Sequence, residues 1–163
     1  MTCFDCLTKG LPKQGDLLVT VRRILESMNY QTLEHIKDQT GRTYAVKMQC
    51  PSSALPFMLV VKGSAIMKDI VSTQKELLEN WHGPLLFAWK RKEDDAPKFY
   101  VFDPEEILRH EIWSNPRFGV KMVNFKLDLG RPWKIGEQGL DEVWVLVKRK
   151  RGEALTSFLE VKA

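Results

Sequence analysis

Residues 57–64 read Phe-Met-Leu-Val-Val-Lys-Gly-Ser, and this stretch decides how the rest of the chain is interpreted. Its first five residues are apolar, and Lys62, Gly63 and Ser64 end the run. A short apolar run bounded by turn residues is typical of a strand that is buried on both faces. We therefore expect a central strand over 57–61, with the remainder of a sheet on either side of it.

Strand and helix patterns alternate on both sides of this run. Asp16 is a candidate N-cap, apolar residues at helical spacing follow it, and Asn29 ends this first helix. Asp103 and Pro104 open another helix, because a capping side chain followed by proline in the first turn is a helix-start signal. The sequence predicts helices over 16–29, 66–81 and from Asp103 onward, and strands over 30–36, 43–48, 57–61, 85–89 and 98–102.

The last third of the chain has a different composition. Residues 114–140 are rich in glycine and proline, and we expect them to wrap the core with one short strand over 120–127. A terminal hairpin is predicted over 142–147 and 155–161, joined by a basic turn at 148–152. The length of 163 residues suits a single domain, 1–163. It would have a core over 15–113, the wrapping segment and hairpin over 114–163, and a flexible arm over 1–14.

Charge and hydropathy bound the classes of partner. The net charge of +4 comes from 25 basic and 21 acidic residues, and it favours nucleic-acid binding only if the positive charge gathers on one face. Two basic clusters, 90–92 and 148–151, fall at expected turns, where solvated hairpin tips are the simpler interpretation. No apolar run is long enough to span a bilayer, and no secretory signal is visible. We expect a soluble cytoplasmic protein with no membrane partner.

Cysteine and histidine do not predict a metal centre. Cys3 and Cys6 form a single C-x-x-C, whereas a structural zinc site needs a second pair of ligands. Cys50 and the three histidines are isolated from one another in the sequence. We expect no metal and no cofactor, and a disulfide or redox role for Cys3 and Cys6 stays open.

The order helix, three strands, helix, strand resembles the PD-(D/E)XK nucleases, and most closely their archaeal Holliday-junction-resolvase-like branch. Asn29 and Tyr30 stand for the Gly-Tyr pair at the end of the first helix of that family, residues 60–62 for its E-x-K strand, and Gln74 for a glutamine in the next helix. The resemblance covers about residues 15–90. It implies an α/β fold with a mixed central β-sheet flanked by helices, a restriction-endonuclease-like core, here with a C-terminal β-hairpin extension.

The residues that carry the chemistry of that family are missing. Two carboxylates would hold a divalent metal that activates water. Val60 stands at the position of the E-x-K glutamate, and residues 44–46 are Tyr-Ala-Val where an aspartate is expected. Leu18 stands near the usual helix glutamate, although Asp16 is close, and Lys62 remains from the core set. The resemblance therefore argues against metal-dependent cleavage, and no residue is expected to be catalytic.

Two alternatives would restore an acid. Glu34 or Asp38 could enter the site from the first strand and the turn that follows it. Residues 160–162 spell a literal Glu-Val-Lys, with Asp141 nineteen residues earlier. This three-letter pattern of common residues often occurs by chance, so a paired terminal strand is the simpler interpretation.

Three functions remain open at this level. The favoured one is a catalytically inactive nuclease-like protein that binds DNA or RNA, because contact with phosphates requires only positive charge. A protein–protein interaction or assembly subunit, including a homo-oligomer, is the first alternative, with Phe118, Phe125 and Trp133 as a contact surface. An atypical metal-dependent nuclease is the second. The candidate nucleic-acid-binding residues are Lys47, Lys62, Lys90, Arg91, Lys92, Lys148, Arg149, Lys150 and Arg151.

Overall fold

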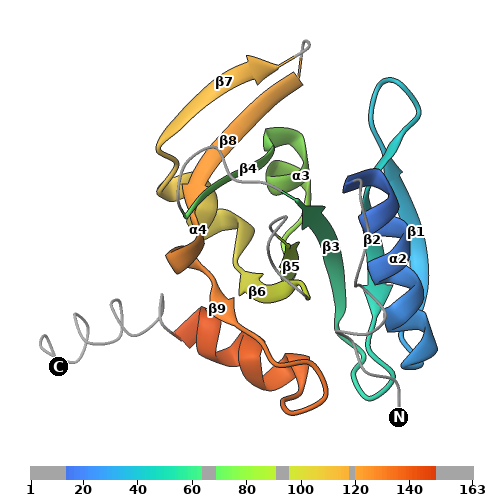
Figure 1. Ribbon diagram of the computed structural model, residues 1–163. Coiled ribbons are helices and arrows are strands. Elements are labelled where there is room, and N and C mark those ends of the chain that lie inside the picture. The colour runs from blue at the N-terminus through green and yellow to red at the C-terminus, as the bar shows by residue number, and fades with distance from the viewer. Residues whose placement is uncertain (1–13, 64–68, 91–95, 118–119, 150–163) are drawn as a thin grey trace, which may run out of the picture.

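Two β-sheets and the helices that cover them form the structure, a computed structural model that describes residues 14–63, 69–90, 96–117 and 120–149 (Figure 1). The strands are β1 (Gln31–Lys37), β2 (Thr43–Gln49), β3 (Pro56–Lys62), β4 (Ile70–Gln74), β5 (Leu85–Trp89), β6 (Lys98–Phe102), β7 (Trp113–Arg117), β8 (Val120–Lys126) and β9 (Arg131–Pro132). The helices are α2 (Gln14–Ser27), α3 (Lys75–Asn80), α4 (Pro104–Arg109), the 3-10 turn η1 (Leu127–Leu129) and a helix over residues 140–149.

The central sheet has six strands in the order β1-β2-β3-β5-β6-β9, and β4-β8-β7 form a smaller sheet. β3 and β5 run parallel, while the other pairs of the large sheet are antiparallel, so the sheet is mixed. The expected α/β class with a mixed central sheet is therefore confirmed. β3 is buried along its middle five residues, as its apolar run predicts. The pairing of β1 with β2 shifts register twice, between Thr32 and Glu34 and between Ile36 and Lys37.

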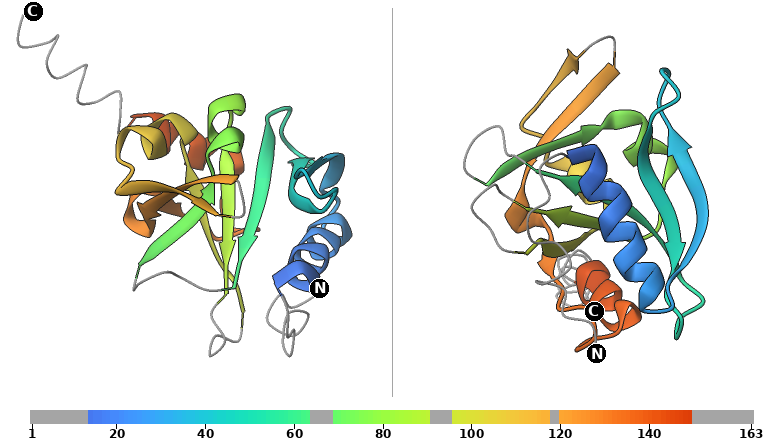
Figure 2. Two further views of the ribbon diagram at one scale, coloured as in Figure 1. Left: turned by 90° about the horizontal axis from the view of Figure 1, so that it is seen from above. Right: turned by 45° about the vertical axis from the view of Figure 1, so that its right-hand side comes forward.

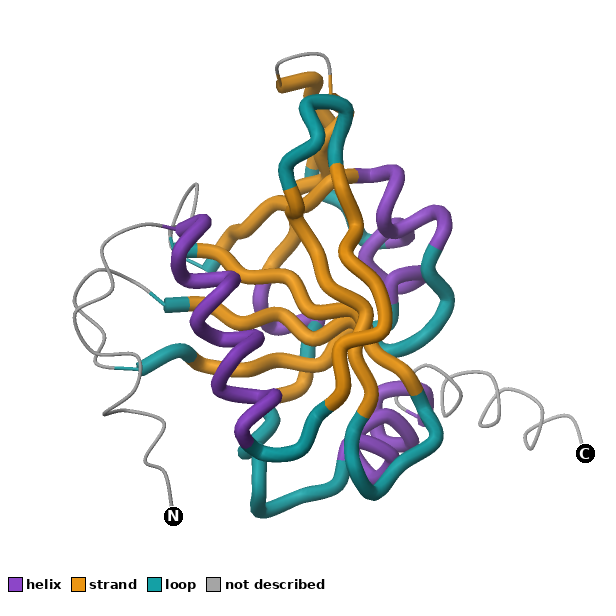
Figure 3. Tube along the Cα trace, turned by 90° about the vertical axis from the view of Figure 1, so that its right-hand side faces the viewer, coloured by secondary structure: helices purple, strands orange, loops and turns teal. Residues whose placement is uncertain are grey.

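Both faces of the large sheet are covered, and side chains alternate between the two cores. Phe57, Leu59 and Val61 of β3 pack against α2 and the 140–149 helix, which the right-hand view of Figure 2 shows on the same side of the sheet. Met58 and Val60 of β3 point into the opposite core, with residues of α3, α4, β4 and β8. Figure 3 shows α2 lying across the strands of the large sheet. Burial of these apolar side chains is the main stabilising contribution to such a fold.

The predicted ends of two helices are confirmed. Asn29 follows α2 with φ of 71°, a left-handed conformation that asparagine tolerates and that commonly ends helices. Its backbone N–H donates to the carbonyl of Glu26. Asp103 caps α4, where its side chain accepts a hydrogen bond of 3.1 Å from the backbone N–H of Glu105, and Pro104 occupies the first turn.

The helix predicted over 66–81 is wrong in the first half of its described length. Residues 70–74 form β4, which pairs antiparallel with β8, and only residues 75–80 are helical. Val71 and Thr73 are buried in alternation, and β-branched side chains of this kind favour a strand. Gln74 therefore lies at the junction of β4 and α3 and not within a helix. Residues 66–68 lie outside the described part of the chain.

The predicted terminal hairpin is also wrong in its first strand. Residues 140–149 form a helix, and Leu140, Val143 and Val147 face the core at helical spacing. The second predicted strand and the end of the basic turn lie among residues 150–163, which the structure does not describe. The segment expected to wrap the core with one strand contains β7 and β9 in addition to β8. Among the described residues, no helix is both long and apolar enough to cross a membrane.

Candidate functional site

The position that the nuclease resemblance assigns to an acid is closed. The Val60 side chain is 2% exposed and packs in an apolar cluster with Phe87, its register partner on β5. Ala45 of β2 is fully buried in the same cluster. A carboxylate at either position would face hydrocarbon, which strongly disfavours its charged form.

The lysines nearest to this position do not form a shared site. Lys62 ends β3, and its carbonyl accepts a hydrogen bond of 3.0 Å from the backbone N–H of Lys90. Lys47 lies opposite Met58, four residues before Lys62, so about 13 Å along the strands separates the two lysines. The Lys47 ammonium lies 5.5 Å from the centroid of the Trp81 ring, a cation–π contact.

The other predicted basic residues divide into buried, paired and exposed ones. The Lys90 residue is only 9% exposed, which leaves little of its side chain for a phosphate. The Lys148 ammonium lies 3.6 Å from Oδ2 of the buried Asp103 and 5.2 Å from the centroid of the Trp144 ring. Arg149 is exposed on the 140–149 helix. Arg91, Lys92, Lys150 and Arg151 lie outside the described residues.

The alternative acids do not meet at the Val60 position. Asp38 stays in the β1–β2 turn, where Oδ1 accepts hydrogen bonds from the Thr40 hydroxyl and backbone N–H and from the Arg42 backbone N–H. These hydrogen bonds lower the pKa of the Asp38 carboxyl. Glu34 is exposed on β1 at the edge of the sheet. Within the described ranges, no group of three or more histidine, cysteine, aspartate or glutamate side chains could hold a metal ion.

The second alternative combines the Glu-Val-Lys triplet at 160–162 with Asp141, which lies on a helix and not on a strand. Asp141 lies in the first turn of the 140–149 helix and accepts a hydrogen bond of 2.5 Å from the hydroxyl of Ser53. The Glu-Val-Lys triplet at 160–162 falls outside the described residues, as do Cys3 and Cys6.

Cys50 is held as a neutral thiol. Burial raises its pKa to about 11, although a hydrogen bond with Tyr30 acts in the opposite direction. Burial also raises the pKa of the Tyr30 hydroxyl. Because the thiolate is the reactive form of cysteine, the position favours packing over nucleophilic chemistry.

Two of the three aromatic residues that were predicted to form a protein-contact surface lie in the core. Phe125 and Trp133 are buried, and the Trp133 indole donates a hydrogen bond of 2.9 Å to the carbonyl of Gln138. Phe118 lies outside the described residues. Phe125 and Trp133 therefore do not supply the apolar surface that the interaction hypothesis requires.

Open space gathers instead around β9, at the opposite end of the sheet from β1. Three hollows of about 620, 330 and 290 Å³ share Pro132 as a lining residue. Lys98, Arg131 and Lys134 are exposed in this region, and each lines one of the two smaller hollows. These three residues are not among those predicted from the sequence. Their signal was basic residues next to aromatic ones, in Lys-Phe-Tyr at 98–100 and in Trp-Lys at 133–134.

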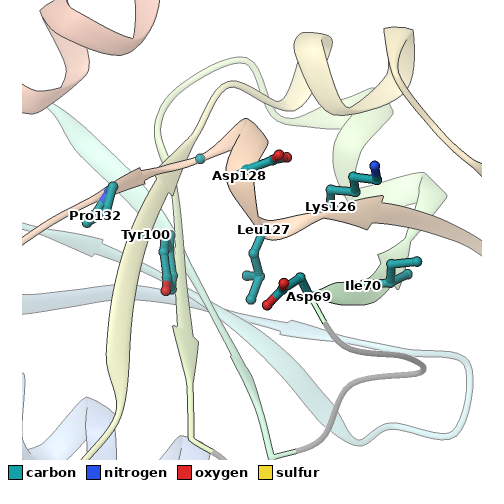
Figure 4. A pocket seen from close by; sticks show the side chains of 8 residues that line it. Asp69, Ile70, Tyr100, Lys126, Leu127, Asp128 and Pro132 are labelled. Carbon is teal, nitrogen blue, oxygen red and sulfur yellow. The ribbon is translucent and has the colours of Figure 1, made fainter.

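The largest hollow contains acids that do not converge (Figure 4). The Asp128 carboxylate points away from Asp69, and the Lys126 ammonium also points away from the hollow. Asp69 has φ of 65°, and its carbonyl accepts a hydrogen bond of 2.9 Å from the backbone N–H of Leu127, which joins β4 to the end of β8. This arrangement does not assemble a paired-carboxylate centre.

Comparison with protein-family models, curated proteins and solved structures finds no match for the chain.

Proposed function

We propose that this chain is a restriction-endonuclease-like protein that has lost metal-dependent cleavage and binds nucleic acid through basic side chains. The order α2-β1-β2-β3 followed by a crossover into β5, parallel to β3, supports the scaffold. This is the arrangement that the resemblance implies, and β4 within the crossover is a departure from it. The observation that carries the loss of cleavage is the burial of Val60 in an apolar cluster at the acid position.

Lys62 cannot replace the missing acids. An ammonium group repels a divalent cation, and Mg²⁺ requires oxygen ligands. Val60 offers only hydrocarbon at one acid position, and residues 44–46, Tyr-Ala-Val, bring no carboxylate to the other. The scaffold can still present positive charge to phosphates, because binding of this kind requires no metal.

The basic region around β9 supports nucleic-acid binding. Lys98, Arg131 and Lys134 come from β6, β9 and the segment that follows, and all three are exposed. Arg131 shares a hollow with Val147 of the 140–149 helix, which carries the exposed Arg149 two residues later. The proposed interface therefore combines the β9 region with Arg149 of the predicted cluster at 148–151. Lys47, Lys62 and Lys90 would contribute less, because they lie apart or are buried.

Salt dependence tests the binding half of the proposal. We expect fluorescence anisotropy with a labelled 20-nucleotide single strand to give an affinity that falls about 600-fold between 20 and 200 mM KCl, the slope for about four phosphate contacts. No binding at 20 mM KCl, or binding that does not change with salt, would contradict the proposal.

Cleavage assays test the other half. Linear and branched DNA incubated with the protein and Mg²⁺ or Mn²⁺ should stay intact. A cleavage product that disappears with Lys62→Ala would overturn the proposed loss of catalysis.

A further inference from the structure

One of the three hollows combines positive charge with an apolar lining. The hollow of about 330 Å³ lies between the start of β6 and the segment after β9, and Lys98 and Lys134 line it. The other described lining residues are apolar or aromatic, and none of them is a carboxylate. Its volume is at the lower end of the range of small-ligand pockets. The hollow is therefore suited to a small anionic group with an apolar part.

Backbone hydrogen bonds fix the segment that carries Lys134. The backbone N–H of Trp133 donates to the carbonyl of Phe99 at 2.9 Å, which continues the β6–β9 pairing. The buried Trp133 indole donates to Gln138, and the Lys134 carbonyl accepts hydrogen bonds from the backbone N–H groups of Glu137 and Gln138. The backbone at Lys134 is thus held beside β6 before any ligand arrives, which lowers the ordering cost of binding.

Tyr100 supplies an aromatic surface at the same place. It is half-buried on β6 opposite Pro132, and both residues line this hollow and the larger one next to it. Figure 4 shows the Tyr100 and Pro132 side chains on the same side of the larger hollow. A nucleic-acid base stacks on aromatic rings of this kind once it is free of a duplex.

We infer that this hollow is a subsite for one nucleotide of a single strand, with its phosphate between Lys98 and Lys134 and its base on Tyr100. The inference rests on the proposed function and names its substrate class. A duplex keeps its bases paired and stacked, so it can offer only its phosphates to the two lysines. The subsite therefore predicts a preference for single strands over duplex.

Anisotropy titrations with a labelled ten-nucleotide oligothymidine, a duplex of equal length and a ten-residue polyglutamate peptide test the inference. We expect Lys98→Ala/Lys134→Ala to weaken single-strand binding at least tenfold and to reduce the salt slope by about 1.4, the loss of two contacts. Tyr100→Leu should weaken binding about 5- to 100-fold with an unchanged salt slope, because it removes stacking and no charge. Tyr100→Phe, which keeps the ring, should bind like the wild type.

The matched control removes two positive charges elsewhere. The control variant is Lys37→Ala/Arg42→Ala, at the opposite edge of the sheet, with Lys37 on β1 and Arg42 in the β1–β2 turn. It should weaken binding less than threefold. Thermal melts establish that each variant is folded. If the wild type binds with a steep salt slope but the double lysine variant keeps its affinity, the subsite is wrong and the proposed function stands. If the wild type binds neither DNA, both fail. Equal affinity for polyglutamate would overturn the subsite in favour of an acidic peptide.

Discussion

β3 and β9 belong to the same sheet and differ in what surrounds them. β3 has seven residues, lies between two strands and is buried on both faces, so the position that the resemblance assigns to a glutamate lies in the core. β9 has two exposed residues at the edge of the sheet, and open space and basic side chains gather around it. The difference teaches that the central strand of this sheet serves packing, while the exposed basic side chains gather at the β9 edge.

The largest expected effect comes from Val60→Glu, which restores a Glu-x-Lys sequence with Lys62. The new charge would enter the apolar cluster without a partner, and the free energy of unfolding should fall by about 3–5 kcal/mol at pH 7. Burial raises the pKa of such a carboxyl above its unfolded value. The loss should therefore be smallest near pH 4, where the group is mostly neutral in both states, and should grow as the pH rises. Urea unfolding between pH 4 and pH 8 measures it.

Val145→Glu provides the control for this substitution. Val145 is 58% exposed on the 140–149 helix, so the same change should alter the free energy of unfolding by less than about 0.5 kcal/mol. Equal losses of the free energy of unfolding in the two variants would contradict the conclusion that Val60 is buried and Val145 exposed. A loss in Val60→Glu that does not depend on pH would contradict it as well.

A smaller effect is expected from Gly130→Ala, just before β9. A Cβ atom at this position would lie 2.6 Å from two ring carbons of Phe102. That ring is fully buried and packs edge-on against Phe125, with ring centroids 5.3 Å apart, so it has little room to move. We expect a loss of about 1–3 kcal/mol from overpacking, measured by chemical unfolding.

Gly139→Ala is the matched control, because a Cβ atom there would meet nothing within 4 Å. Its effect should stay below that of Gly130→Ala. If Gly130→Ala has the same free energy of unfolding as the wild type, the β9 region is not packed tightly against Phe102. The β3 and β9 regions would then contribute to stability independently.

The smallest expected effect on the fold concerns Cys50, on the α2 side of the sheet. In a Cys3→Ser/Cys6→Ser background, iodoacetamide at pH 8 should alkylate the native protein at least 100-fold more slowly than the unfolded one. Burial raises the thiol pKa from 9.0 to about 11, and each pKa unit lowers the thiolate fraction tenfold. The stability linked to this group is fully present below pH 9 and is lost as the pH rises through 11. If the alkylation rate of the native protein levels off near pH 9, the Cys50 thiol titrates as it does in the unfolded chain. The α2 side of the sheet would then be accessible to solvent at Cys50.

The elements that were predicted correctly are those whose local pattern agrees with their final burial. β3 and β5 are apolar runs buried on both faces, and α4 begins with a cap that the structure confirms at Asp103. Residues 142–147 are rich in valine, which favours a strand, yet they form part of a helix. Packing of Val143 and Val147 against the sheet favours the helix over the strand. A local sequence pattern does not reveal packing of this kind.

The candidate site was harder to predict than the fold. Lys98 is separated in the sequence from Arg131 and Lys134, and only the short pairing of β6 with β9 brings the three into one region. A two-residue strand has no periodicity from which it could be predicted. The predicted Lys148, in contrast, belongs to a visible basic run, but the structure pairs it with Asp103, a contact that depends on the fold.

Pro132 has a consequence for the protein in a crowded solution. Proline has no backbone N–H, so β9 cannot offer a full ladder of donors to a strand from another molecule. At the other edge, the two register shifts of β1 and its charged residues Glu34 and Lys37 act in the same direction. Both edges of the sheet therefore resist pairing with strands of another molecule. The β9 region can stay exposed to solvent without aggregating with copies of the same chain.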